Sequence, residues 1–120
     1  MCIRDRYMNG IRGAIAVVEN NKEDIVESSK LLFSSIIEKN NLEPKKITSV
    51  VFTVTHDLTE AFPAKAIRDL GYDYIPVIDT LAPNISSDLN GCIRVLVLYS
   101  DKVDVKHVYL HDAKNLRPDR

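Results

Sequence analysis

The sequence predicts a single α/β (α+β) domain, a mixed β-sheet of about five strands with two helices packed against it, in the order β-α-β-α-β-β-β. Three observations predict this fold class. One long stretch carries apolar residues at helical spacing, several shorter stretches are rich in β-branched residues, and no internal repeat or linker interrupts them. With 120 residues, the chain can bury a core without disulfides or metal.

The first half of the chain is predicted to hold two strands and the longest helix. Residues 9–18 form the first expected strand. The helix is expected to follow a cap at Asn20 or Asn21, because acidic residues come next and suit the positive end of its dipole. Its apolar pattern runs to about Lys39. The β-branched residues 47–54 are expected to form the second strand.

Proline and glycine set the expected boundaries of the next elements. A short helical turn is expected before Pro63, because proline is not tolerated deep inside a helix. A second helix is expected from Pro63 to Leu70, closed by Gly71. The third strand is expected at residues 74–78, and Pro76 places it at an edge of the sheet or interrupts it.

The rest of the chain is expected to contain a loop and two more strands. Residues 79–90 are polar and predict the loop. Residues 92–99 are apolar on both alternating faces, as in a strand covered on both sides, and residues 105–110 predict the last strand. Residues 1–7 join poorly to this pattern, so we interpret them as a non-native leader before one domain over residues 8–120.

Composition excludes several classes of protein. Sixteen basic residues against seventeen acidic ones give a net charge of −1, so no global field attracts nucleic acid or an anionic membrane. No apolar run approaches the length of a membrane span. Two cysteines cannot build a disulfide framework, which makes the cytoplasm the expected location.

Four basic residues and one phenol are the candidate binding groups. Arg94 lies inside the apolar strand 92–99, where an unpaired charge would be very costly. Arg12 lies inside the first strand, Lys65 and Arg68 share a face of the second helix, and Tyr109 lies in the last strand. Several donors on a rigid frame suit a small dianion with two carboxylates. The alternatives are a structural ion pair for each arginine in a strand, a solvated helix face, and packing of the phenol.

Other chemistry has little support in the sequence. His107 and His111 have the spacing of a metal pair on a helix, but this stretch reads as extended. Cys92 has no base nearby and is expected in the core. No glycine-rich phosphate loop, CxxC pair or nucleophile elbow is present, so we expect neither a metal nor a cofactor.

Five blocks of the chain resemble one known family. The blocks are "GIRGA", "FPAKAIRDLGYDYIPV", "CIRVLVL", "HVYL" and "LRPD". In this order, from about Asn9 to Asp119, they resemble the monofunctional chorismate mutases of the Bacillus type. The resemblance implies a cofactor-independent Claisen rearrangement of the dianion chorismate to prephenate, on the shikimate route to phenylalanine and tyrosine. It also implies a homotrimer shaped as a pseudo α/β-barrel, with active sites between subunits.

The resemblance also implies roles for individual residues. Arg12 and Tyr109 would hold a substrate carboxylate, and Arg94 would reach the ether oxygen where negative charge grows. The other residues implied to line the pocket are Phe62, Lys65, Arg68, Ile78, Asp79, Thr80, Leu81 and Ala82, with Arg117 in a mobile tail that closes over it.

One position departs from the family pattern. Ala82 stands where the family has a glutamate that meets the substrate hydroxyl and the arginine matched by Arg94. Asp79 precedes it by three residues, and we hypothesise that its carboxylate replaces the glutamate close to Arg94. Alternatively, Asp79 is a turn residue and the enzyme is weakened. Two further functions stay open: an inactive trimer that binds a small dicarboxylate, and an unrelated trimeric enzyme of similar build.

Overall fold

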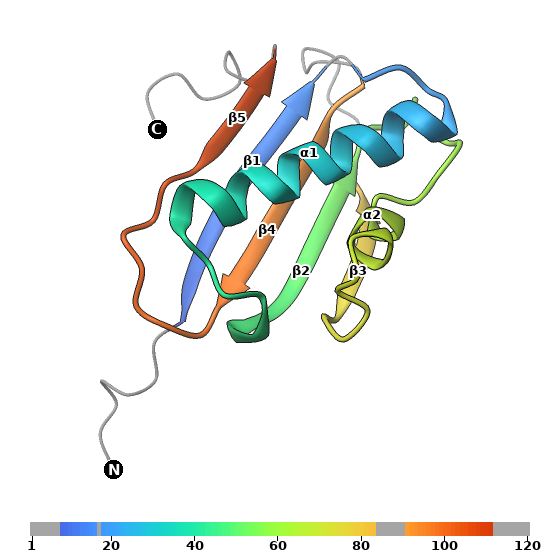
Figure 1. Ribbon diagram of the computed structural model, residues 1–120. Coiled ribbons are helices and arrows are strands. Elements are labelled where there is room, and N and C mark those ends of the chain that lie inside the picture. The colour runs from blue at the N-terminus through green and yellow to red at the C-terminus, as the bar shows by residue number, and fades with distance from the viewer. Residues whose placement is uncertain (1–7, 17, 84–90, 112–120) are drawn as a thin grey trace.

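The sheet runs in the order β3-β2-β4-β1-β5, with α1 and α2 on one face (Figure 1). The computed structural model describes residues 8–16, 18–83 and 91–111. Its elements are β1 (Asn9–Ala16), α1 (Lys22–Asn40), a 3₁₀ helix η2 (Pro44–Lys46), β2 (Ile47–Val54), α2 (Ala64–Asp69), β3 (Val77–Leu81), β4 (Ile93–Tyr99) and β5 (Val108–His111). β4 is antiparallel to β1 and β2, whereas β5 and β3 run parallel to their neighbours. The expected mixed five-stranded fold with two α-helices is confirmed.

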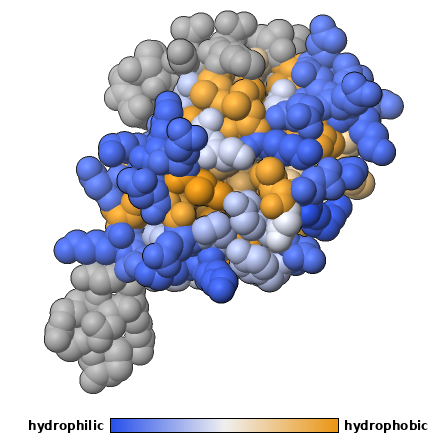
Figure 2. All heavy atoms as spheres, viewed as in Figure 1, coloured by the Kyte–Doolittle hydropathy of each residue, from blue (hydrophilic) through white to orange (hydrophobic). Residues whose placement is uncertain are grey.

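The long helix α1 begins and ends where local signals place it. The side chain of Asn21 accepts a hydrogen bond from the Asp24 N–H at 2.7 Å, and this caps the first turn. Asn41 adopts a left-handed conformation and closes the last turn. Ile25, Leu32, Phe33, Ile36 and their neighbours bury one face of the helix against the sheet. In Figure 2, hydrophilic side chains surround the hydrophobic ones that show on this side of the molecule.

β3 starts later than the sequence predicts. Of the expected strand at 74–78, the first part is a turn in which the Ile75 N–H donates to the Tyr72 carbonyl at 3.0 Å. Pro76 lacks an N–H and precedes the first strand residue. β3 therefore takes in the first residues of the predicted 79–90 loop, and that prediction was wrong there. The edge position is confirmed.

The helical turn expected before Pro63 was wrong, since residues 55–62 contain no helix. Asp57 does not cap a helix. Its carboxylate accepts hydrogen bonds from the Gly91 N–H at 2.9 Å and from the Thr55 hydroxyl at 2.5 Å. The segment thus fastens the end of β2 to the start of β4.

The start of the predicted 105–110 strand is held by side chains rather than by a strand ladder. The buried Asn40 amide accepts from the Lys106 N–H at 2.7 Å and donates to its carbonyl at 2.9 Å. His107 Nδ1 accepts from the Arg12 N–H at 3.0 Å. β5 proper begins one residue later, so the prediction was early by three residues.

Alternation along the strands separates two faces of the sheet. On β4, Val95 and Val97 are buried toward α1, whereas Arg94 and Leu96 point to the other side, which we call the open face. The strand register assigns further residues to the open face: Arg12 and Ala14 of β1, Val51 and Thr53 of β2, Ile78 and Thr80 of β3, and Tyr109 of β5. Within the described residues, no helix is long and apolar enough to cross a membrane.

Gly91 fixes the start of β4, and alanine there should destabilise the protein. Its φ is 60°, and an added Cβ would lie 2.4 Å from the Val18 carbonyl oxygen. Gly71, with φ 93° and open space around it, is the matched control. We expect Gly71→Ala to lose about 1–2 kcal/mol from backbone conformation alone. Gly91→Ala should lose about 1–3 kcal/mol more from the clash. Urea unfolding measures both, and equal losses would contradict the clash.

His107 should make stability depend on pH. Burial and the nearby Arg12 charge lower the pKa of its imidazole below the ordinary value of 6.5. Because the unfolded chain then binds the proton more readily, the free energy of unfolding should fall as pH drops below that value. His107→Asn, which keeps an acceptor, should lose this component when unfolding is compared at about pH 7.5 and about pH 5.5. The exposed His56→Asn is the control, and identical pH dependence in the two variants would contradict the assignment.

Candidate active site

Three of the predicted site residues gather on the open face of the sheet. The register places Ala14 of β1 between Arg94 of β4 and Tyr109 of β5, and Arg12 lies two residues before Ala14 on β1. Tyr109 packs against a small buried cluster that includes Ala14 and Cys92. We call Arg12, Arg94 and Tyr109 the sheet-face cluster. All three are half-buried, and all three stand on strands. The sheet rather than a loop therefore fixes where these side chains begin.

Small side chains make room for this cluster. Ala14 and Ala16 are 1% exposed, and the Tyr109 ring packs on them. Cys92 is fully buried here, as predicted. The Arg12 backbone is held in turn by His107, because its N–H donates to the imidazole. Arg94 lies on β4, with Thr53 of β2 opposite on its second side.

Six other predicted site residues line a pocket between α2 and the end of β3, which we call the α2 pocket. It has a volume of about 490 Å³, within the range of small-molecule sites. The predicted residues among its lining are Phe62, Lys65, Arg68, Asp79, Thr80 and Leu81. Phe62 is 69% exposed and Leu81 is 58% exposed, so apolar surface remains uncovered beside the cations. Lys65 Nζ pairs with Asp69 at 3.1 Å.

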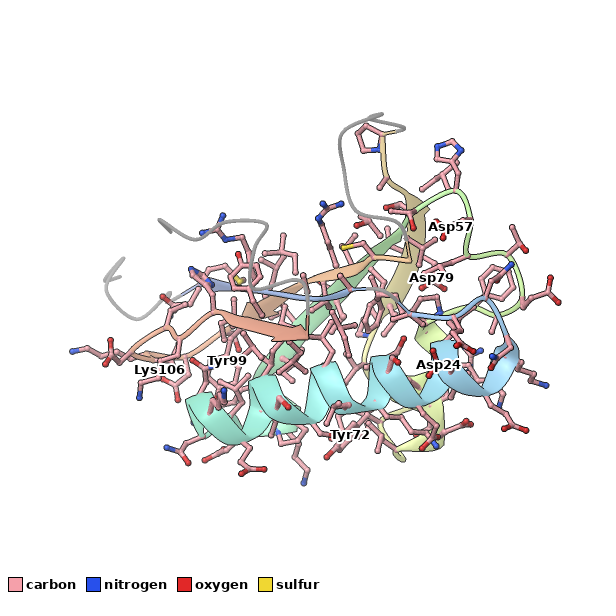
Figure 3. The ribbon with its side chains drawn as sticks, turned by 90° about the horizontal axis from the view of Figure 1, so that it is seen from above. Asp24, Asp57, Tyr72, Asp79, Tyr99 and Lys106 are labelled. Carbon is pink, nitrogen blue, oxygen red and sulfur yellow. The ribbon has the colours of Figure 1, made fainter. Side chains whose placement is uncertain are left out.

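Asp79 lies in the α2 pocket and not beside Arg94 of the same chain. The register pairs Asp79 with the core residue Phe52, whereas Arg94 pairs with Thr53, which faces the other way. The Asp79 carboxylate accepts from the Ala64 N–H at 3.1 Å, between β3 and α2 (Figure 3). Burial raises the pKa of this carboxyl, while the Ala64 hydrogen bond and the Arg68 charge oppose the rise. The register therefore separates Asp79 from Arg94 within one chain, and the replacement of the family glutamate by Asp79 stays a prediction.

The remaining predicted positions are Ile78, Ala82 and Arg117. Ile78 lies on the open face opposite Val51 and is 59% exposed. Ala82 is buried just after β3, and its N–H donates to the Val54 carbonyl at 2.9 Å. Arg117 lies outside the described residues.

Lys22 and Glu60 also line the α2 pocket, and sequence reasoning missed both. The loop before α2 returns to the start of α1 because the Asn20 side chain accepts from the Thr59 N–H at 2.8 Å and from the Glu60 N–H at 3.2 Å. No spacing in the sequence signals this contact, since the partners are 39 and 40 residues apart.

The arrangement offers charge and shape. The sheet-face cluster has two guanidinium groups and a phenol, and the α2 pocket adds two ammonium groups and a guanidinium. Such donors recognise carboxylates and stabilise developing negative charge. Among the described residues, no group of three or more His, Cys, Asp or Glu side chains could hold a metal ion.

Comparisons with known proteins agree on one family. The family model for chorismate mutase type I matches residues 8–120. Chorismate mutase AroH of Bacillus subtilis (strain 168) is 37% identical over 116 residues, which cover 93% of this chain and 91% of that protein. The AroH of Thermus thermophilus is 39% identical over 116 residues, covering 93% and 95%.

A solved structure shares the architecture as well as the sequence. The chorismate mutase from Clostridium thermocellum superposes with a TM-score of 0.84 at 39% identity, covering 88% of this chain and 97% of that one. Sequence and fold therefore lead to the same conclusion: the chain belongs to the chorismate mutase type I family.

Proposed function

We propose that the protein is a chorismate mutase that rearranges chorismate to prephenate. In this reaction one C–O bond breaks and one C–C bond forms within a single molecule, and no proton is transferred. The observation that carries the proposal is the sheet-face cluster of cations and a phenol, held on neighbouring strands of one sheet. Such a site can hold a reactive conformer of a dianion and stabilise the charge that grows at the ether oxygen.

Each member of the sheet-face cluster has a separate role in the proposal. Arg12 and Tyr109 hold a carboxylate, for which a guanidinium can supply two parallel hydrogen bonds. Arg94 donates to the ether oxygen. Its position on the central strand β4 supports this role, because a donor on a strand needs little reorganisation during the reaction.

We further propose that the active site is shared between copies of the chain in a homotrimer. The sheet-face cluster lies on β4, β1 and β5, whereas the α2 pocket lies at the other edge of the sheet between β3 and α2, and this separation supports closure of the site by a second copy. Exposed apolar side chains support burial by a second copy, since Ile78 and Leu96 lie on the open face, and Phe62 and Leu81 line the pocket.

Several expectations remain predictions. Closure by Arg117, independence from cofactors and a cytoplasmic location belong to this group. The inactive dicarboxylate-binding trimer gains no support from the comparisons, and turnover of chorismate by the purified protein would exclude it.

Substitution of Arg94 tests the reaction. Arg94→Ala should lower kcat about 10²–10³-fold, because it removes a donor from the ether oxygen. Arg94→Lys should also be severe, because the ammonium keeps the charge but lacks the planar fork. The matched control is Lys45→Ala, since Lys45 is an exposed cation of η2. Loss of chorismate absorbance follows the rate, and unchanged turnover in Arg94→Ala would contradict the proposed role.

Mixing two inactive variants tests the shared site. Arg94→Ala damages the open face and Arg68→Ala damages the α2 pocket, so each alone should lose activity. If each site takes Arg94 from one copy and Arg68 from the next, unfolding and refolding an equal mixture should restore about a quarter of the sites. Separately refolded variants combined afterwards without exchange are the control. A mixture as inactive as its components would contradict a site shared between copies.

A further inference from the structure

We infer that Asp79 is a positioning residue, whose carboxylate fastens the start of α2 to β3 and so fixes the cations of the α2 pocket. The inference rests on the proposed function for its kinetic part only. The hypothesis that the Asp79 carboxylate lies close to Arg94 stays a prediction for a site shared between copies, because within one chain the two residues face opposite sides of the sheet.

The first turn of α2 has no cap within its own segment. Pro63 occupies the N-cap position and makes no side-chain hydrogen bond there. The first helical residue, Ala64, donates its N–H to Asp79 Oδ1 at 3.1 Å, and this acceptor comes from the neighbouring strand β3. A strand residue 15 positions later in the chain thus takes the place of a local cap.

This contact matters because α2 cannot hold its place by its own stability. The helix has six residues, far fewer than an isolated helix needs in water. Ala64, Ala66 and Ile67 are buried and attach one side of the helix to the core. Lys65 and Arg68 lie on the side that lines the pocket. The Asp79 hydrogen bond adds a directional contact at the first residue of the helix, Ala64. Lys65 and Arg68 come directly after this residue in the same helix.

The charge of Asp79 should weaken the affinity for a dianionic substrate, whereas its hydrogen bond to Ala64 should support that affinity. Lys22, Glu60, Lys65 and Arg68 line the same pocket, and Arg68 is close enough to lower the pKa of the carboxyl. An ionised Asp79 offsets part of this positive charge and opposes a dianion. The acceptor oxygen of Asp79 therefore supports the shape of the pocket, while the charge of Asp79 weakens the affinity of the pocket for substrate. A substitution that removes the charge and keeps the acceptor can test the inference.

Asp79→Asn and Asp79→Ala form the matched pair. Asparagine keeps an oxygen acceptor for the Ala64 N–H without the charge, so kcat should stay within about twofold and KM should fall. Alanine leaves a backbone donor without its partner, so KM should rise about tenfold while kcat changes little. Asp73→Ala removes an exposed carboxylate from the turn between α2 and β3 and is the control. Each variant is assayed at a temperature where circular dichroism shows it folded.

Two outcomes would overturn the inference. A loss of kcat of about a hundredfold in Asp79→Asn would mean that the charge acts on the reacting atoms. Equal kinetics in Asp79→Asn and Asp79→Ala would mean that the Ala64 contact does not position the pocket.

Hydrogen exchange at the Ala64 amide keeps the structural part testable even if the protein does not turn over chorismate. Exchange should speed up in Asp79→Ala and stay near wild type in Asp79→Asn. Unchanged exchange in Asp79→Ala would overturn the anchoring contact itself. Failure of the proposed function, by contrast, would appear as absent turnover in the wild type with this exchange pattern intact.

Discussion

The central position of β4 is the constraint on which the rest of the molecule depends. Antiparallel pairing with β1 on one side and β2 on the other fixes which side chains face α1 and which face away. Val95 and Val97 complete the core on one face, and this places Arg94 on the other. A slip of one residue would bury the guanidinium under α1 and expose the valines. The hydrophobic core and the position of Arg94 are therefore determined by the same register.

A hydrogen-bond network at the ends of β2 and β4, made by the half-buried Thr55 and the exposed Asp57, maintains that register. Asp57 accepts from the Gly91 N–H, and the Thr55 hydroxyl accepts from the Cys92 N–H at 3.1 Å. These contacts lie within three residues of Arg94, so they limit how far the start of β4 can shift. The carboxylate of Asp57 thus acts on the start of β4 through the backbone.

Sequence reasoning succeeded where a signal is local and failed where a face of the sheet had to be chosen. The cap at Asn21 and the second strand at 47–54 were predicted because capping and β-branched patterns act over a few residues. Asp79 was placed beside Arg94 because the resemblance aligned their neighbourhoods. The two residues face opposite ways only because Asp79 pairs with Phe52, and pairing partners across strands leave no mark in one sequence.

The distribution of helices then explains why an arginine can lie inside an apolar strand. Residues 92–99 resemble a strand covered on both sides, yet α1 and α2 cover only one face (Figure 3). Leu96 is 38% exposed and Arg94 is half-buried, so this face carries both an apolar and a cationic side chain. On the proposed arrangement, a second copy of the chain would cover the apolar part, and the dianionic substrate would lie against the guanidinium. Assembly and substrate binding would then be two requirements of one surface, and this accounts for a strand pattern at 92–99 that looks fully buried although neither α1 nor α2 covers this face.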